Sequence, residues 1–239
     1  MRIVISQPMY FPWIGFMSQL AMADVVIWLD DVSFSKGSFT NRIQIKGKSF
    51  PDWLSISLHN KGKNQLICEL QCADSNIRQI HYSKLYNYFS KCTYRENALS
   101  LFEQTWEIDQ PLFKTIIKST EVLMDKFLPR RPTTYLSSAL NTTGTGTNRV
   151  LELVQKFNGT TYITGHGAKN YLDHEAFEQS GVSVEYMKYG PYSWPQQHGT
   201  FNPFVSSLDI IANVGFANCQ NHMVLETVDW KDFTNRVQV

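Results

Sequence analysis

Two prolines, Pro8 and Pro12, follow the apolar run of residues 3–5 and constrain the start of the chain more than any other feature. Each proline removes a backbone hydrogen-bond donor and fixes its own φ, so a strand cannot continue through them. The residue before a proline is pushed away from the helical region, so no helix begins before Pro12. Residues 7–12 therefore predict a stiff extended loop that displays an amide and two aromatic rings. In α/β proteins such loops line the ligand crevice at the carboxyl edge of the sheet.

Short continuous apolar runs predict buried strands at residues 2–6, 25–29, 161–164 and 182–186. Continuous rather than alternating runs indicate that both faces of each strand are covered, as in a parallel sheet. Helix-forming residues between the runs predict crossover helices, over residues 14–23 in the first unit and 170–179 in the second. We therefore expect an α/β fold with a mostly parallel, Rossmann-like sheet.

The middle of the chain predicts elements outside this sheet. Alternation in residues 54–58 predicts a half-exposed strand, which residues 65–70 could pair with as a hairpin. Apolar stripes at helical spacing across residues 77–128 predict a helical insertion within a single domain of residues 1–239. Thr147 and Ser206 are expected to begin two later helices as N-caps.

Composition limits the classes of function. Lys plus Arg number 22 and Asp plus Glu 21, and this balance argues against a general nucleic-acid-binding protein. The four cysteines form no C-x-x-C pair and have no histidine at zinc spacing, so we expect no metal site and a reducing compartment. No run approaches the roughly 18 consecutive apolar residues of a membrane span. We expect a cytoplasmic protein with no membrane insertion and no nucleic-acid partner.

Three loops, over residues 7–13, 30–42 and 165–169, follow predicted parallel strands and should meet at one edge of the sheet. In the second, Asp30 and Asp31 end a buried strand and are candidates to bind a cation, a substrate amine or Mg²⁺; the alternative is a turn cap that pairs with Lys36. Lys36, Asn41 and Arg42 are candidate anion ligands, and the alternative is an ordinary solvated loop.

The third loop places His166 between Gly165 and Gly167 at the start of a helix. Backbone N–H groups there could bind an anion or a developing oxyanion, and His166 could act as a general base or phosphate ligand. A surface histidine in a tight turn is the alternative. Gln196 and His198, in an irregular aromatic stretch, could read substrate hydroxyls or only satisfy loop backbone.

Several blocks of this sequence resemble the WbqC-like family. They are Q-P-x-Y-x-P-W-x-G-F from Gln7, the block from Leu29 to Lys36 with Asn41-Arg42, G-H-G-A-K-N-Y-L from Gly165, and the stretch from Tyr192 to Asp209. The blocks occur in order from residue 3 to about residue 215, and residues 60–145 match least.

This resemblance implies a role in bacterial surface-polysaccharide assembly, including O-antigen regions, with proposed aminoacyl (glycyl) transfer to amino sugars. It marks a set of pocket residues: Gln7, Tyr10, Trp13, Asp30, Asp31, Lys36, Asn41, Arg42 and Gly165. The expected partner is a small-molecule nucleotide sugar. ATP or another activated acyl donor is left open as cosubstrate, as is a homo-oligomer.

A second likeness is to the nucleotide-binding fold with an H-x-G-H loop, as in pantothenate synthetase and the nucleotidyltransferases. That fold also begins with a strand, a proline-containing loop and a helix. This chain has Trp13 and Phe16 where that loop has its histidines, so the groups that would stabilise a pentavalent phosphate are missing.

We therefore expect an enzyme that acylates an amino-sugar amine, with His166, Asp30 and Asp31 as catalytic candidates. The remaining candidates would bind substrate, and we expect Tyr10, Arg42 and His166 to enclose one small molecule. A non-catalytic nucleotide-sugar-binding protein and a nucleotidyltransferase-like enzyme are the alternatives.

Overall fold

The computed structural model describes residues 1–47, 51–107 and 109–235. Residue 108 of the predicted helical stretch and residues 48–50 and 236–239 of the predicted domain lie outside the described residues.

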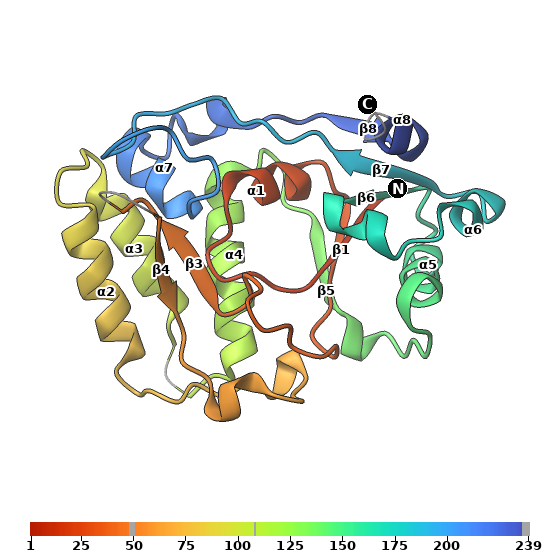
Figure 1. Ribbon diagram of the computed structural model, residues 1–239, viewed down its shortest axis with the longest axis horizontal. Helices are drawn as coiled ribbons and strands as arrows, with labels where there is room; N and C mark the ends of the chain where they lie inside the picture. Colours follow the sequence, from red (N-terminus) through yellow and green to blue (C-terminus); the bar gives the residue numbers. More distant parts are fainter. Residues whose placement is uncertain (48–50, 108, 236–239) are drawn as a thin grey trace.

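The centre of the molecule is a six-stranded sheet in the order β5-β2-β1-β6-β7-β8 (Figure 1). Its strands are β1 (Arg2–Ser6), β2 (Val25–Trp28), β5 (Thr133–Leu136), β6 (Thr161–Thr164), β7 (Ser183–Met187) and β8 (Thr227–Asp229). The first five run parallel and β8 pairs antiparallel with β7. The prediction of an α/β fold with a mostly parallel, Rossmann-like sheet is confirmed.

The strand order reverses between β1 and β6, because the chain builds outward through β2 and β5 on one side and through β7 on the other. A ligand crevice in an open α/β sheet lies at this reversal, outside the carboxyl ends of the strands. The loops after β1 and β6 are therefore the ones that would flank a ligand bound at this reversal.

The helices lie on both faces of the sheet. They are α1 (Ile14–Ala21), α2 (Ile77–Tyr88), α3 (Arg95–Thr105), α4 (Leu112–Phe127), α5 (Gly146–Lys156), α6 (His174–Gln179), α7 (Ser207–Val214) and α8 (Trp230–Asn235). Figure 1 shows α1 and α4 to one side of β1 and α5 to the other. None of the helices described is long and apolar enough to cross a membrane.

Alternate residues of the central strands belong to two different cores. Val4 and Val26 pack into the larger core with α1, α3, α4 and α7. Their neighbours Ile3 and Val25 pack into a second core with α5 and α6. Burial of both faces explains why the strands read as continuous apolar runs.

A separate antiparallel hairpin joins β3 (Arg42–Ile45) to β4 (Asp52–Ser55). The predicted pairing of residues 54–58 with residues 65–70 is wrong in its partners: β4 pairs with β3, and Leu58 forms an isolated antiparallel bridge with Cys72. Ile67–Glu69 form a short 3₁₀ turn, and the backbone N–H of Ile67 donates to Val32 O at 3.0 Å.

Two predictions of helix starts have different outcomes. Ser206 is the N-cap of α7, as predicted, and its side chain accepts from Leu208 N. Thr147 does not cap α5, which begins one residue earlier at Gly146. Its hydroxyl instead accepts from Asp173 N at 2.9 Å, so it links the start of α5 to the start of α6. That helix begins at His174 rather than at residue 170, because His166–Asn170 form a 3₁₀ turn.

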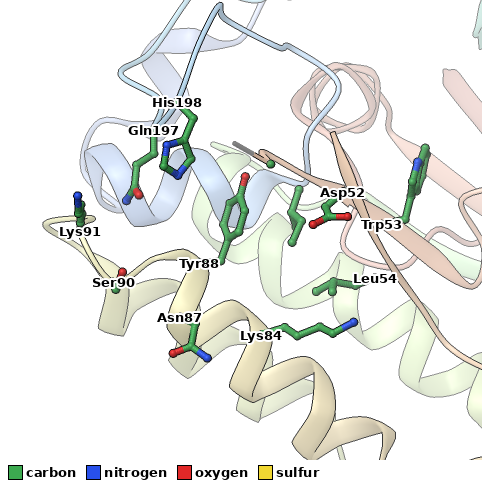
Figure 2. Close-up of a pocket in the computed structure, with 12 residues that line it drawn as sticks. Asp52, Trp53, Leu54, Lys84, Asn87, Tyr88, Ser90, Lys91, Gln197 and His198 are labelled. Carbon is green, nitrogen blue, oxygen red and sulfur yellow. The ribbon is translucent and has the colours of Figure 1, made fainter. Parts of the chain in front are cut away.

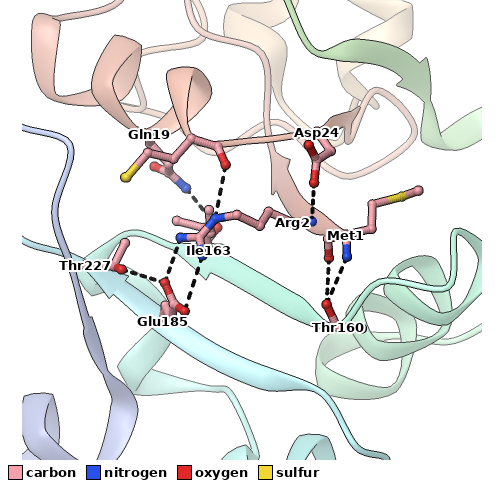
Figure 3. Close-up of polar contacts among 9 residues, drawn as sticks. Met1, Arg2, Gln19, Asp24, Thr160, Ile163, Glu185 and Thr227 are labelled. Carbon is pink, nitrogen blue, oxygen red and sulfur yellow. Dashed lines mark hydrogen bonds and ion pairs between the residues drawn. The ribbon is translucent and has the colours of Figure 1, made fainter.

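Polar contacts hold strands of the sheet together away from the carboxyl edge (Figure 3). The Arg2 guanidinium lies 2.7 Å from Glu185 Oε2, and the same carboxylate oxygen accepts from Thr227 Oγ1 at 2.5 Å. Gln19 of α1 donates to the backbone carbonyl of Ile163 in β6 at 3.1 Å. These contacts join β1, β7 and β8 and fix α1 against β6. None of them involves a predicted site residue at the carboxyl edge.

Candidate active site

Strand register brings three predicted site residues to neighbouring positions on the carboxyl edge. Ser6 of β1 pairs with Trp28 of β2, and Val4 pairs with Ile163 of β6. Continuing each strand places Gln7 at the end of the middle strand, Asp30 to one side and His166 to the other. Because neighbouring strands lie about 4.8 Å apart, the backbones of Asp30 and His166 are separated by roughly 10 Å.

His166 is held in one orientation at the end of β6. Its Nε2 lies 2.8 Å from the carbonyl oxygen of Met187 in β7. A carbonyl oxygen only accepts, so Nε2 carries the proton and Nδ1 keeps a lone pair. The imidazole packs between Tyr189 and Phe233, with ring centroids 4.8 and 4.7 Å away, and the residue is exposed.

An aromatic wall connects His166 to the loop after β1. Trp13 packs against Tyr189 at a tilt, with 4.8 Å between ring centroids, and the same phenol contacts His166. Gly165 has no room for a side chain here, because an added Cβ would lie 2.8 Å from the Tyr189 hydroxyl. Gly167 has open space around it, so its presence is not explained by packing. Burial raises the pKa of Tyr189 to about 12, so the phenol stays neutral at physiological pH.

The two aspartates after β2 have different environments. Asp30 is 1% exposed, and its carboxylate accepts from Ser138 N at 3.0 Å, Ser138 Oγ at 2.7 Å and Ser137 Oγ at 3.2 Å. These bonds tie the end of β2 to the end of β5, which favours the structural alternative for Asp30 over the catalytic prediction.

Asp31 is more accessible and pairs with a cation. Burial favours a higher pKa for this carboxyl, but hydrogen bonds from Ser137 and Arg149 outweigh it and hold the pKa below its usual range. Arg149 Nη2 lies 2.6 Å from Asp31 Oδ2, with side-chain exposures of 15% and 25%. A carboxylate of lowered pKa is a weak proton acceptor, so Asp31 is suited to positioning rather than to general-base catalysis.

Tyr10 does not face a ligand, contrary to the prediction. It is 1% exposed, and its hydroxyl contacts His81 Nδ1 at 3.2 Å. Phe11 is also 1% exposed, and its N–H donates to Ser119 Oγ of α4 at 2.8 Å. The proline-rich loop turns both rings into the larger core, because α2, α3 and α4 offer them an apolar surface.

Of three further candidates, Arg42 begins the hairpin strand β3, and Lys36 and Asn41 lie in the segment between β2 and β3. Arg42 donates to Gly37 O and stacks on Trp53 at 4.2 Å from the ring centroid. Asn41 Nδ2 donates to the backbone carbonyl of Ile56 at 2.9 Å, and Lys36 is an exposed turn residue. The expectation that Tyr10, Arg42 and His166 enclose one molecule is therefore wrong for Tyr10, and Arg42 lies on a different element from His166.

The last two candidates lie on the loop of residues 196–204. Gln196 makes reciprocal bonds with Asn202, at 2.8 and 2.9 Å, and therefore satisfies loop backbone. His198 lines a pocket of about 730 Å³ between the hairpin, α2 and this loop (Figure 2). We call it the hairpin pocket; its lining residues are Ile45, Gly47, Asp52, Trp53, Leu54, Lys84, Asn87, Tyr88, Ser90, Lys91, Gln197 and His198.

Several residues of these sites were not predicted from the sequence. Ser137 and Ser138 follow β5, a strand with no continuous apolar run. Arg149 carried a usable signal: a cation near the start of a helix opposes the helix dipole, which indicates a specific anionic partner. In the part of the chain that the structure describes, no group of three His, Cys, Asp or Glu could hold a metal ion.

Comparison with known proteins gives the family. The sequence model of the family described as "WbqC-like protein family" matches residues 7–221. A curated relative, "Uncharacterized protein Rv1507c" of Mycobacterium tuberculosis (strain ATCC 25618 / H37Rv), is 26% identical over 225 residues, covering 90% of this chain and 94% of that protein. No solved structure gives a significant match. The matched region contains both the carboxyl-edge residues and the hairpin pocket, and the chain belongs to the WbqC-like protein family.

Proposed function

We propose that this protein is an acyl or aminoacyl transferase that forms an amide on the amine of a nucleotide-linked amino sugar. The observation that carries the proposal is the contact between His166 Nε2 and Met187 O at 2.8 Å. It fixes the imidazole tautomer and leaves Nδ1 as a proton acceptor beside the strand-order reversal. The resemblance to proteins of surface-polysaccharide regions, O-antigen clusters among them, supports the choice of an amino sugar as acceptor.

The chemistry needs one proton acceptor and an activated acyl donor. The amine nitrogen attacks the acyl carbonyl, and the new N–C bond forms as the bond to the leaving group breaks. The leaving group departs with the electron pair, and the amine proton moves to His166 Nδ1. A glycyl or other aminoacyl thioester, phosphate or adenylate would supply the donor.

Other residues of the carboxyl edge would position the substrates. Trp13 and Tyr189 form an aromatic wall against which a sugar ring can pack. Asp31 would accept hydrogen bonds from sugar hydroxyls while Arg149 offsets its charge. Gln7, at the end of β1, would supply an amide between the two clusters.

Mass spectrometry tests this reaction class. The protein is incubated with UDP- and dTDP-linked amino sugars together with glycine and ATP, or with acyl and aminoacyl thioesters. The proposal predicts that the sugar nucleotide gains the mass of the acyl group. No mass gain with any donor and acceptor pair would contradict it, and pyrophosphate release without acylation would favour nucleotidyl transfer.

Substitution of His166 separates an enzyme from a binding protein. For an enzyme, His166→Gln should lower kcat by about 10²- to 10⁴-fold with little change in KM. His174→Gln is the matched control. Like His166, His174 makes a hydrogen-bond contact, with the Tyr186 hydroxyl at 2.7 Å, and packs on an aromatic ring, that of Trp230.

A non-catalytic nucleotide-sugar-binding protein is the second candidate. The observation in its favour is that the hairpin pocket is formed without His166, Asp30 or Asp31. That function predicts nucleotide-sugar binding that is unchanged in His166→Gln and no acylated product.

A further inference from the structure

The hairpin pocket has the size and wall chemistry of a site for a small molecule. Its volume of about 730 Å³ falls within the roughly 300–1,000 Å³ of ligand pockets in proteins. Three separate parts of the chain form it: the β3–β4 hairpin, α2 with the turn that follows, and the loop of residues 196–204. None of the carboxyl-edge residues described above lines it.

The loop wall of the hairpin pocket is fixed in place. The Gln196 amide donates from Nε2 to Asn202 O and accepts at Oε1 from Asn202 N, and Asn202 Nδ2 donates to Gln44 Oε1 of β3 at 3.1 Å. The Lys46 ammonium, at the end of the hairpin strand, donates to the backbone carbonyl of Thr200. These contacts attach the loop to β3, so this wall of the pocket is held in place by the protein itself.

Positive charge predominates around the pocket. Lys84 and Lys91 line it, and Asp52 is the single carboxylate among the described lining residues. No ion pair among the described residues includes Lys84 or Lys91. Figure 2 shows Lys84 extended toward the Trp53 side and Lys91 on the opposite side, with Tyr88 between them. Arg42 does not line the pocket, but its guanidinium lies over the Trp53 indole and adds a cation near the Lys84 end.

The wall also offers rings and a hydroxyl without a partner. Trp53 is 37% exposed and contributes an aromatic surface. The Tyr88 hydroxyl is buried and has no hydrogen-bond partner among the described residues. Burial raises the pKa of this phenol, so it remains a donor over the physiological range. Buried polar groups are nearly always paired in proteins, so a ligand oxygen is a fitting partner for this O–H.

We propose that the hairpin pocket binds an organic phosphate that carries a ring, a nucleotide or a sugar phosphate, as a ligand site separate from the carboxyl edge. Lys91 and Lys84 attract phosphate oxygens from opposite sides of Tyr88, and Trp53 packs against the ring at the Lys84 end of the pocket. Asn87 and Gln197 supply amide groups for the polar edge of the ligand. The claim does not depend on the acyl transfer proposed above.

Calorimetric titration of the full chain tests the site. The probes are the five nucleoside diphosphates ADP, GDP, UDP, CDP and dTDP, three hexose phosphates (glucose 1-phosphate, glucosamine 1-phosphate and glucose 6-phosphate), and pyrophosphate. At least one ring-bearing phosphate should bind more tightly than pyrophosphate, and Lys84→Gln and Lys91→Gln should each weaken it about 5-fold or more. Trp53→Ala should weaken the ring-bearing ligand and leave pyrophosphate binding unchanged. The nucleotide and hexose arms distinguish the two classes of ligand.

Two controls make the result decisive. Lys156→Gln removes an exposed lysine of α5 that does not line the pocket, and it should leave binding unchanged. His166→Gln should also leave binding unchanged, so a failure of the proposed catalysis is distinguishable from a failure here. Absence of binding by every probe would overturn the proposal. Equal losses in Lys156→Gln, or loss only in His166→Gln, would overturn it as well.

Discussion

The phenol of Tyr10 lies 3.2 Å from Nδ1 of His81 and joins the loop after β1 to α2. On its other side, His81 Nε2 lies 3.3 Å from the backbone carbonyl of Ser55 in β4. Nε2 therefore carries the imidazole proton, and Tyr10 donates to Nδ1. This chain of contacts runs from the central sheet to the hairpin through buried groups.

Removal of the Tyr10 hydroxyl should destabilise the fold. Tyr10→Phe leaves His81 Nδ1 without its donor in a buried site, at a cost of about 1–3 kcal/mol. Urea denaturation monitored by circular dichroism measures the free energy of unfolding. Tyr192→Phe, at a side chain that is 64% exposed, is the control and should change little. Equal stability of the two variants would show that the contact contributes nothing.

Acid should weaken the fold through His81. Burial lowers the pKa of His81 to about 4, whereas an unfolded histidine titrates near 6.5. Between these values the unfolded chain binds the proton and the folded chain does not, so stability is full above about pH 6.5 and falls as the pH drops toward 4. His81→Gln should remove up to about 3 kcal/mol of this pH dependence. Parallel unfolding curves for both proteins from pH 7 to pH 4.5 would contradict the assignment.

Asp209 should have the opposite effect. Burial raises its pKa to about 6, although Trp194 Nε1 donates to its carboxylate at 2.8 Å. The folded state therefore holds a proton that the unfolded state has lost, and stability decreases as the pH rises from about 4 to 6. Asp209→Asn keeps an acceptor for Trp194 without the charge. Its stability relative to the original protein should rise by up to about 3 kcal/mol between pH 4 and pH 8. A difference that does not vary with pH would be inconsistent with this account.

The absence of a side chain at Gly15 should be required for the Trp13 indole to pack where it does. A Cβ at this position would lie 2.3 Å from the indole ring, so Gly15→Ala must displace Trp13 from Tyr189 and Phe204. We expect a loss of about 1–3 kcal/mol and a shift in tryptophan fluorescence. Gly167→Ala is the matched control for stability, because open space surrounds that residue. An unshifted emission spectrum in Gly15→Ala would contradict the predicted packing.

The sequence predicts the sheet well because its strands are buried on both faces. The runs at residues 2–6 and 25–29 lie where β1 and β2 form. β5 was missed because it is an edge strand whose residues alternate between exposed and partly exposed, and β8 because it is only three residues long. The sequence does not predict β3, because Arg42 and Gln44 interrupt its apolar residues; it places Arg42 at the end of a polar loop and gives residues 43–45 no element.

The candidate site was predicted in part, for a related reason. Strand ends are readable from sequence, so the positions of Asp31 and His166 on the carboxyl edge follow from the predicted order. The direction of a loop side chain depends on which distant surface it can bury against. The sequence could not show that α2 would place His81 beside Tyr10, or that Arg42 would stack on Trp53.

The central claim is that His166 presents an unprotonated Nδ1 at the strand-order reversal. Long-range ¹H–¹⁵N NMR of the ¹⁵N-histidine-labelled protein at pH 8 tests it, with His166→Gln to assign the resonance. The contact with Met187 O predicts a single tautomer with the proton on Nε2 and a lone pair on Nδ1. A proton on Nδ1, or two tautomers in rapid exchange, would contradict the account.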